Sequence, residues 1–152
     1  DYTAASDALL GSSLTASSTT KLSDISSSTT GVESIKGLSE NDKIDLSSLG
    51  LNNGIVFKAS GSTANAVDTI SGGNVLSDLK NLFVSKSISN NTVTSSVVGA
   101  AVWTDDSGNS LVFVNNAGTT DFDASKDSVI AVSGASLNAQ QVAQSIVMSH
   151  LS

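Results

Sequence analysis

Residues 101–114 read Ala-Val-Trp-Thr-Asp-Asp-Ser-Gly-Asn-Ser-Leu-Val-Phe-Val, and this stretch decides the fold class of the chain. Two β-prone runs, Ala101–Thr104 and Leu111–Val114, flank the loop Asp105–Asn109. The Asp, Gly and Asn residues of that loop favour a turn, and a glycine-containing loop of this length between two such runs is typical of a hairpin. The stretch therefore predicts two adjacent antiparallel strands.

Further β-strands are predicted on both sides of this hairpin. Upstream, short segments at 31–37 and 42–47 carry alternating apolar residues, and a turn sequence at 52–54 precedes the run Ile55–Phe57. Downstream, the segment 128–132 carries apolar residues on both faces. A strand with two apolar faces is usually an interior strand, so we expect this segment to be covered on both sides.

Two helices are predicted as well. The apolar residues of Val75–Phe83 recur at helical spacing, and a Gly-Gly-Asn sequence before them supplies a break and a cap. The segment from about Asn138 to Leu151 has an apolar stripe, with Asn138 and Gln141 placed as a capping box. Between the central helix and the hairpin, a polar turn near 90–91 leads into further β-structure.

These elements predict a mainly β fold, arranged as a β-sandwich or as a β-roll-like stack of short strands, with one central helix and one C-terminal helix. We expect residues 31–152 to form a single terminal domain. Residues 1–30 are rich in Ser and Thr, but apolar residues such as Leu22 and Ile25 interrupt the tract. That pattern predicts short β rungs or a partly flexible segment before the domain.

Composition narrows the functional classes. The chain of 152 residues has no Cys, no Pro and one His, and its formal net charge is −7. Few side chains suited to nucleophilic or metal chemistry are present, so we expect a protein that is not an enzyme. The negative charge disfavours nucleic acid as a partner. No apolar run approaches the length of about 20 residues that a membrane span needs.

Calcium is the candidate ion, because it accepts carboxylate, amide and backbone oxygens. Asp121, Asp123 and Asp127, together with Ser125, place oxygen ligands at alternate positions before the last predicted strand, as at the start of a calcium loop. The alternative is an ordinary polar turn. Asp42 and Asp45 form a second candidate pair, although strand alternation would point them to opposite faces.

Three other groups of residues are weaker candidates. Asp105, Asp106 and Asn109 also gather oxygen ligands, but a hairpin turn would use the same residues. Trp103 and Tyr2 offer aromatic surfaces for stacking on sugars, and the alternative is that Trp103 packs in the core.

His150 is the only histidine, and a lone histidine near a chain end is usually a solvated residue of a helix rather than a metal ligand.

Three stretches of the chain resemble the C-terminal regions of RTX-type and S-layer bacterial proteins that type I secretion exports. They are Gly31-Val-Glu-Ser-Ile35, Asp42-Lys-Ile-Asp-Leu-Ser-Ser-Leu-Gly50 and the hairpin-to-strand block Ala101–Gly134, which ends in Asp127-Ser-Val-Ile-Ala-Val-Ser-Gly134. The resemblance implies a secreted or cell-surface module at the end of a longer chain, with its export signal near the final helix. The Gly-Gly-x-Gly-x-Asp repeats of a calcium-bound β-roll do not occur, so dense calcium binding is not implied.

We therefore expect a non-catalytic structural module that supports extracellular folding, export or self-assembly and is stabilised by calcium. Its partners would be like subunits or the rest of a longer parent chain. The alternative function is a glycan- or host-surface-binding module of an adhesin or secreted hydrolase, with a polysaccharide as its partner and Trp103 in the binding surface.

Overall fold

A computed structural model describes residues 21–25, 32–59, 70, 73–105, 107–124 and 126–149 of the chain. The elements in chain order are η1 (Leu22–Asp24), β1 (Val32–Lys36), β2 (Ile44–Asp45), η2 (Ser47–Leu49), β3 (Ile55–Ala59), η3 (Leu76–Asp78), β4 (Val84–Ser89), β5 (Thr92–Val97), β6 (Ala100–Thr104), β7 (Ser110–Val114), β8 (Ser128–Ser133), α1 (Ala139–Gln144) and β9 (Ile146–Val147). The fold is mainly β, as predicted.

One five-stranded sheet organises the molecule, with strand order β1-β8-β7-β6-β3. The predicted hairpin forms its antiparallel centre as β6 and β7, and β8 extends it antiparallel to β7. The two edge strands, β1 and β3, pair in parallel with β8 and β6. The described strands therefore form one mixed sheet with two small two-stranded ribbons beside it, rather than the sandwich or β-roll that we expected.

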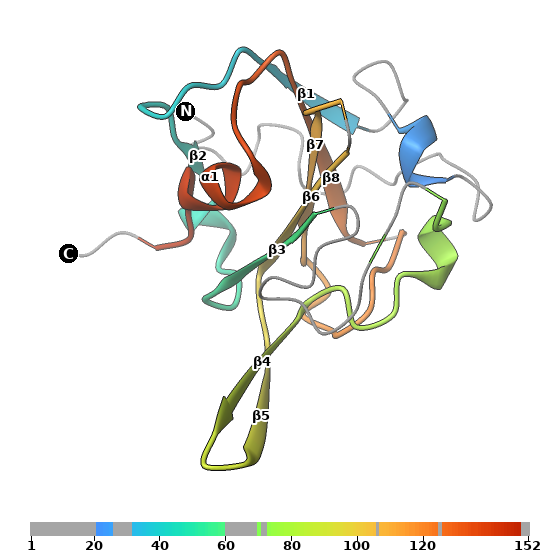
Figure 1. The fold of residues 1–152 in the computed structure, drawn as a ribbon, viewed down its shortest axis with the longest axis vertical. Helices are drawn as coiled ribbons and strands as arrows, with labels where there is room; N and C mark the ends of the chain where they lie inside the picture. Colours follow the sequence, from blue (N-terminus) through green and yellow to red (C-terminus); the bar gives the residue numbers. More distant parts are fainter. Residues whose placement is uncertain are drawn as a thin grey trace.

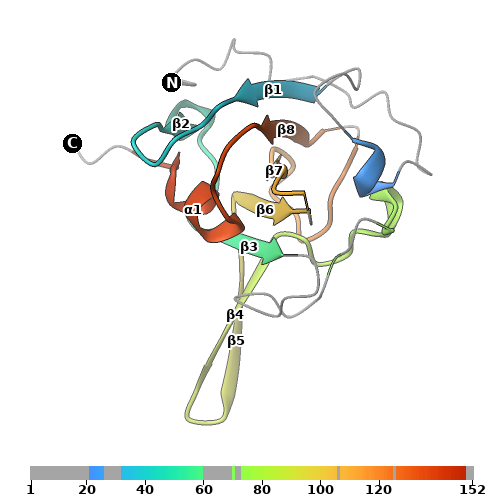
Figure 2. The same ribbon diagram turned by 45° about the horizontal axis from the view of Figure 1, so that its top comes forward.

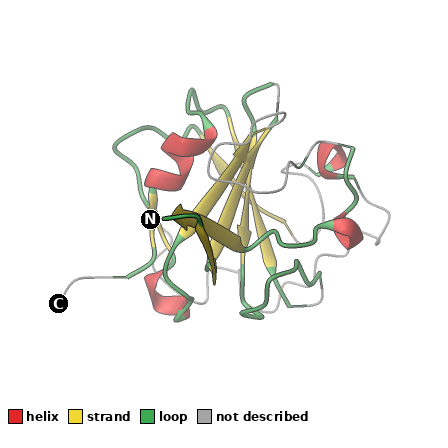
Figure 3. Ribbon diagram, turned by 60° about the horizontal axis from the view of Figure 1, so that its bottom comes forward, coloured by secondary structure: helices red, strands yellow, loops and turns green. Residues whose placement is uncertain are grey.

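Both faces of this sheet are covered, and short elements cover them (Figure 3). On one face, α1 packs against β3 and β6, and β2 and β9 complete the cover. On the other face, η1, η3 and the loops around them bring in Leu22, Leu76, Phe83 and Phe122. The interior strands β6, β7 and β8 consequently have apolar residues on both faces, as predicted for the segment 128–132.

The predicted central helix is wrong. Residues Val75–Phe83 form only the 3-10 turn η3 followed by further turns. The Asn74 backbone carbonyl, which would accept the first hydrogen bond of such a helix, instead accepts the Leu22 N–H (3.0 Å). Asn81 then takes a positive φ of 54°, which ends any helical path. The helical spacing reflects burial of Leu79 and its apolar neighbours under the sheet, not a helix.

The predicted C-terminal helix is present but shorter than expected. Its capping box is confirmed: Asn138 Oδ1 accepts the Gln141 N–H (2.8 Å), and the Gln141 side chain accepts the Asn138 N–H (3.0 Å). Helix α1 ends at Gln144, because the following Ile146–Val147 forms β9 and pairs in parallel with β2. Ile146 and Val147, both β-branched, therefore pair as a strand instead of extending the helix.

The Ser/Thr-rich segment is described only at residues 21–25. There Lys21 forms an isolated antiparallel β-bridge with Val75, and Leu22 and Ile25 are buried in the core. The rest of the predicted rungs lies outside the described residues.

One hairpin leaves the body of the molecule. Strands β4 and β5 pair with each other only, and Figures 1 and 2 show them projecting from the sheet. We call this hairpin, residues 84–97, the arm.

Candidate functional site

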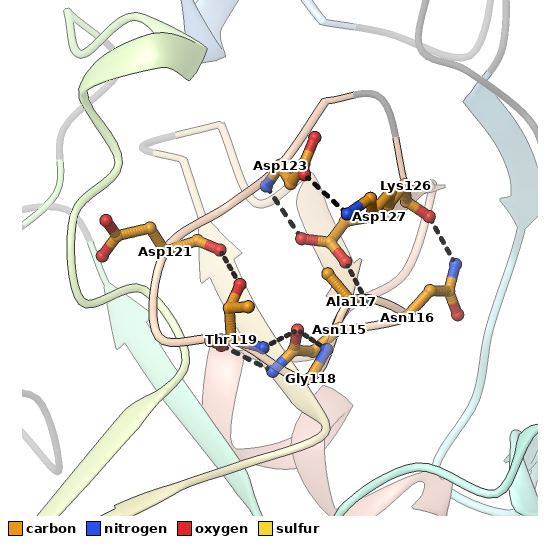
Figure 4. Close-up of polar contacts among 9 residues, drawn as sticks. All are labelled: Asn115, Asn116, Ala117, Gly118, Thr119, Asp121, Asp123, Lys126 and Asp127. Carbon is orange, nitrogen blue, oxygen red and sulfur yellow. Dashed lines mark hydrogen bonds and ion pairs between the residues drawn. The ribbon is translucent and has the colours of Figure 1, made fainter.

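The loop between β7 and β8 contains three of the predicted calcium ligands (Figure 4). The Asp127 carboxylate is fully buried and points into the loop. Its Oδ1 accepts the Ala117 N–H (2.8 Å) and its Oδ2 accepts the Asp123 N–H (2.8 Å). Burial raises the pKa of Asp127, and the two N–H donors oppose that rise. Both oxygens therefore hold the backbone of the loop together.

Asp121 lies apart from that network, with its carboxylate turned away from those of Asp123 and Asp127 in Figure 4. Its Oδ1 accepts the Asn81 N–H (2.9 Å) and its Oδ2 lies 3.7 Å from the Lys80 ammonium. The hydrogen bond from Asn81 is the main reason that the pKa of Asp121 is lowered. This carboxylate thus connects the loop to the turn that precedes β4.

Asp121 and Asp123 both line an open hollow of about 450 Å³ beside η3. Each has a lysine near it, since the Lys126 ammonium lies 3.9 Å from Asp123 Oδ2.

Asp42 and Asp45 close two separate local turns. Asp42 Oδ2 accepts both the N–H and the hydroxyl of Ser39 (2.9 and 2.8 Å), and the backbone bond is the main cause of its lowered pKa. Asp45 Oδ1 accepts the N–H and the hydroxyl of Ser47 (3.0 and 2.6 Å). Within the described ranges, no three His, Cys, Asp or Glu residues gather where they could hold a metal ion.

The hairpin loop Asp105–Asn109 uses its first residue as a turn former. Asp105 Oδ1 accepts the N–H groups of Ser107 and Asn109 (2.9 Å each). Gly108 has a φ of 84°, which favours glycine. Asp106 lies outside the described residues, as do Tyr2 and His150.

Trp103 is 2% exposed and packs with the core on the η1 side of the sheet. The interpretation of Trp103 as a core residue is therefore confirmed, and the alternative of an open stacking surface at this residue is not.

Asn115 is a structural residue whose role the sequence did not reveal. It is buried at the end of β7, where its Nδ2 donates to the carbonyls of Val98 and Thr119 (2.9 Å each). Its Oδ1 accepts the N–H groups of Gly118 and Thr119 (2.9 and 3.2 Å), as Figure 4 shows in part. One side chain thus joins the base of the arm to the loop after β7.

The arm exposes large apolar side chains to solvent. Ile88 and Val93 are cross-strand partners near its tip, and they are 75% and 58% exposed. They are the large apolar residues that are exposed among those described. The turn between them consists of Asn90 and Asn91, both with positive φ, which matches the tight turn of a two-residue hairpin.

The two faces of the arm differ in chemistry. Directly opposed residues share a face, and on one face every residue carries a hydroxyl: Ser85, Ser87, Ser89, Thr92, Thr94 and Ser96. We call this the hydroxyl face. The other face contains Val84, Lys86, Ile88, Val93, Ser95 and Val97, and we call it the apolar face. Its base is covered by the body, because Val84 is buried, but its tip is not.

The joint between the arm and the sheet is tightly packed. Gly99 joins β5 to β6, and the space where a Cβ would lie is already occupied by the Asn52 carbonyl and the Met148 methyl group. Its N–H donates to the Gly54 carbonyl (3.2 Å), and its carbonyl accepts the Asn115 N–H (2.9 Å). The arm is therefore held firmly at its base.

No family profile, curated protein or solved structure matches this chain. In the described part of the chain, helices are too short or too polar to cross a membrane.

Proposed function

We propose that this chain is a non-catalytic structural module of a secreted or surface-layer bacterial protein, and that its arm joins one copy to the next. The single observation that carries the proposal is the exposed apolar tip of the arm, Ile88 and Val93. The secreted setting comes from the resemblance of residues 31–50 and 101–134 to the terminal regions of RTX-type and S-layer proteins.

The pattern of the arm supports a covered state. Strands that alternate between polar and apolar residues normally bury their apolar face. In a single copy, the apolar face of the arm is exposed at Lys86, Ile88 and Val93. A two-stranded hairpin alone is only marginally stable in water, so contact with a partner would stabilise it.

Charge supports a second copy of the same chain as that partner. Lys86 is the only charged residue among residues 84–97, so the arm is positive while the chain as a whole carries a net charge of −7. The remainder of each copy is therefore acidic, and it attracts the arm of another copy. A contact between an arm and a different surface joins molecules head to tail, and such contacts build open chains or rings.

The test is self-association of the full chain, measured by analytical ultracentrifugation over a wide concentration range. We expect the wild type to associate as concentration rises, and we expect Ile88→Lys to remain monomeric because it places a charge in the apolar contact. The matched control is Ser87→Lys, which adds the same charge on the hydroxyl face; we expect it not to weaken association, because it leaves the apolar contact intact and adds to the positive charge of the arm.

Reversal of the arm charge gives a second measurement. Lys86→Glu weakens association if attraction to an acidic body contributes, and the weakening is greatest at low salt. A wild type that stays monomeric at all concentrations would contradict the proposed function, as would equal loss of association in Ile88→Lys and Ser87→Lys.

A further inference from the structure

A cavity of about 270 Å³ lies on the η1 side of the sheet, where the ends of β6, β7 and β8 meet the hairpin loop. Its polar lining consists of Ser23, Trp103, Asp105, Asn109, Ser110 and Ser133. Ile25 and Leu111 contribute apolar surface. The volume is just below the roughly 300–1,000 Å³ of small-molecule pockets, which suits a ligand of no more than one ring.

Trp103 gives the cavity an unusual feature. The side chain is 2% exposed, and its Nε1 has no hydrogen-bond partner among the described residues. A buried donor without an acceptor destabilises the folded state, so native structures rarely leave one unpaired. Trp103 lines the cavity, but Nε1 is itself fully buried, so an acceptor oxygen on a molecule in the cavity would supply the missing bond when the indole edge turns toward it.

The rest of the lining indicates the kind of molecule. Asp105 supplies a carboxylate whose Oδ1 is engaged by the loop backbone and whose Oδ2 has no bond within the described residues. Asn109, Ser23 and Ser133 can each donate and accept. Ser110 alternates with Leu111 along β7, so its hydroxyl lies on the α1 side of the sheet, where it bonds the Thr104 hydroxyl (2.8 Å between the oxygens) and adds no donor to the cavity. The lining therefore offers both donors and acceptors beside an apolar wall.

From these observations we infer that the cavity binds an uncharged polyhydroxyl molecule the size of one sugar ring. Asp105 and the net charge of −7 disfavour an anion. Ring hydroxyls can accept from Trp103 Nε1 and donate to Asp105, while the C–H surface of the ring packs on Leu111 and Ile25. This binding mode uses the edge of the indole ring. It is independent of the arm and of the proposed self-association.

The wild type carries its own probe, because Trp103 is the only tryptophan. The experiment is titration of the full chain with the methyl pyranosides of glucose, galactose, mannose and N-acetylglucosamine, followed by tryptophan emission and by the melting temperature. We expect saturable changes in both with at least one of these sugars. Acetate and methylammonium serve as charged comparison ligands, and we expect neither to saturate.

Two variants locate the site. Ser133→Leu fills the cavity without changing the tryptophan and should weaken binding at least about tenfold, whereas Ser136→Leu, the same change at an exposed position outside the cavity, should leave affinity unchanged. Trp103→Phe keeps an aromatic ring but removes the N–H, and we expect about tenfold weaker binding by thermal shift.

Unchanged emission and melting with every sugar would overturn the inference, as would saturation by a charged ligand alone. Wild-type affinity in a folded Ser133→Leu would also overturn it.

Discussion

Two hairpins follow one another in this chain, and their surroundings differ. In β6–β7, residues on both faces are buried between α1 on one side and η1 and η3 on the other. In the arm, residues from Lys86 to Ser96 are exposed on both faces, and partial burial begins only at Ser85 and Val97 near the base. Both hairpins contain β-branched residues, which favour strands. Whether the residues of a strand become part of the core is decided by the helices and loops that cover the strand.

The difference also appears in side-chain size and chemistry. The β6–β7 hairpin places Trp, Phe, Leu and Val on its faces, and these fill the space under the short helices. The arm carries hydroxyls on one face and two apolar pairs, Val84–Val97 and Ile88–Val93, on the other. Stability of the domain should therefore depend on the first hairpin and association on the second.

The largest effect that would follow from this comparison is the loss of Phe113 in β7. Its ring is fully buried and meets Phe122 edge to face, with ring centroids 5.4 Å apart. We expect Phe113→Ala to lower the free energy of unfolding by about 3–5 kcal/mol, measured by urea denaturation. A loss below about 1 kcal/mol would contradict the division between the hairpins.

A smaller effect concerns the loop that closes β7–β8. The pKa of Asp127 in the folded chain is raised above its ordinary value of 3.8, mainly by burial. The folded state therefore holds this proton more tightly than the unfolded state, so the contribution of Asp127 to stability falls as pH rises through the raised pKa.

Asp127→Asn should be destabilising, by about 1–3 kcal/mol at neutral pH, because Ala117 and Asp123 donate to different oxygens of Asp127, and the amide would place an NH₂ group against one of these two N–H donors. The difference in the free energy of unfolding between wild type and Asp127→Asn should increase as the pH is lowered toward 4. Asp42 and Asp121, whose pKa values are lowered, lose stability on acidification in both proteins, so the difference isolates Asp127. A gap that narrows on acidification would contradict this account.

The smallest effect is expected in the arm. The double change Ile88→Thr and Val93→Thr should alter the free energy of unfolding by less than about 0.5 kcal/mol, because neither side chain is buried in a single copy. Amide hydrogen exchange under monomeric conditions should be fast in the arm and slow in β6–β7. Equal protection in the two hairpins would remove the contrast on which the proposed function rests.

Much of the sheet could be predicted from local pattern. The strands at Ile55–Ala59, 100–104, 110–114 and 128–133 follow from β-prone runs between turn residues, and the interior place of β8 follows from its two apolar faces. The helical spacing of apolar residues at Val75–Phe83 led to the wrong prediction of a helix, because apolar residues in consecutive turns can reach the same core without one.

The features that the sequence did not predict depend on distant partners. The end of α1 is set by pairing of Ile146 with Ile44, about a hundred residues away. The carboxylates of Asp42, Asp45 and Asp127 accept backbone N–H groups, which a pattern of acidic residues cannot distinguish from ion ligands. The exposure of Ile88 is equally hidden, since an alternating strand normally predicts a covered face.

The length of the arm has a further physical consequence. Six residues per strand at about 3.3 Å each place the tip about 20 Å from the sheet, and the crowded joint at Gly99 opposes bending there. Copies linked through arm tips would be held apart by the length of the arm. The resulting lattice would be a mesh with gaps wide enough for water and small solutes to cross, and shortening the arm would tighten the mesh without altering the domain that carries it.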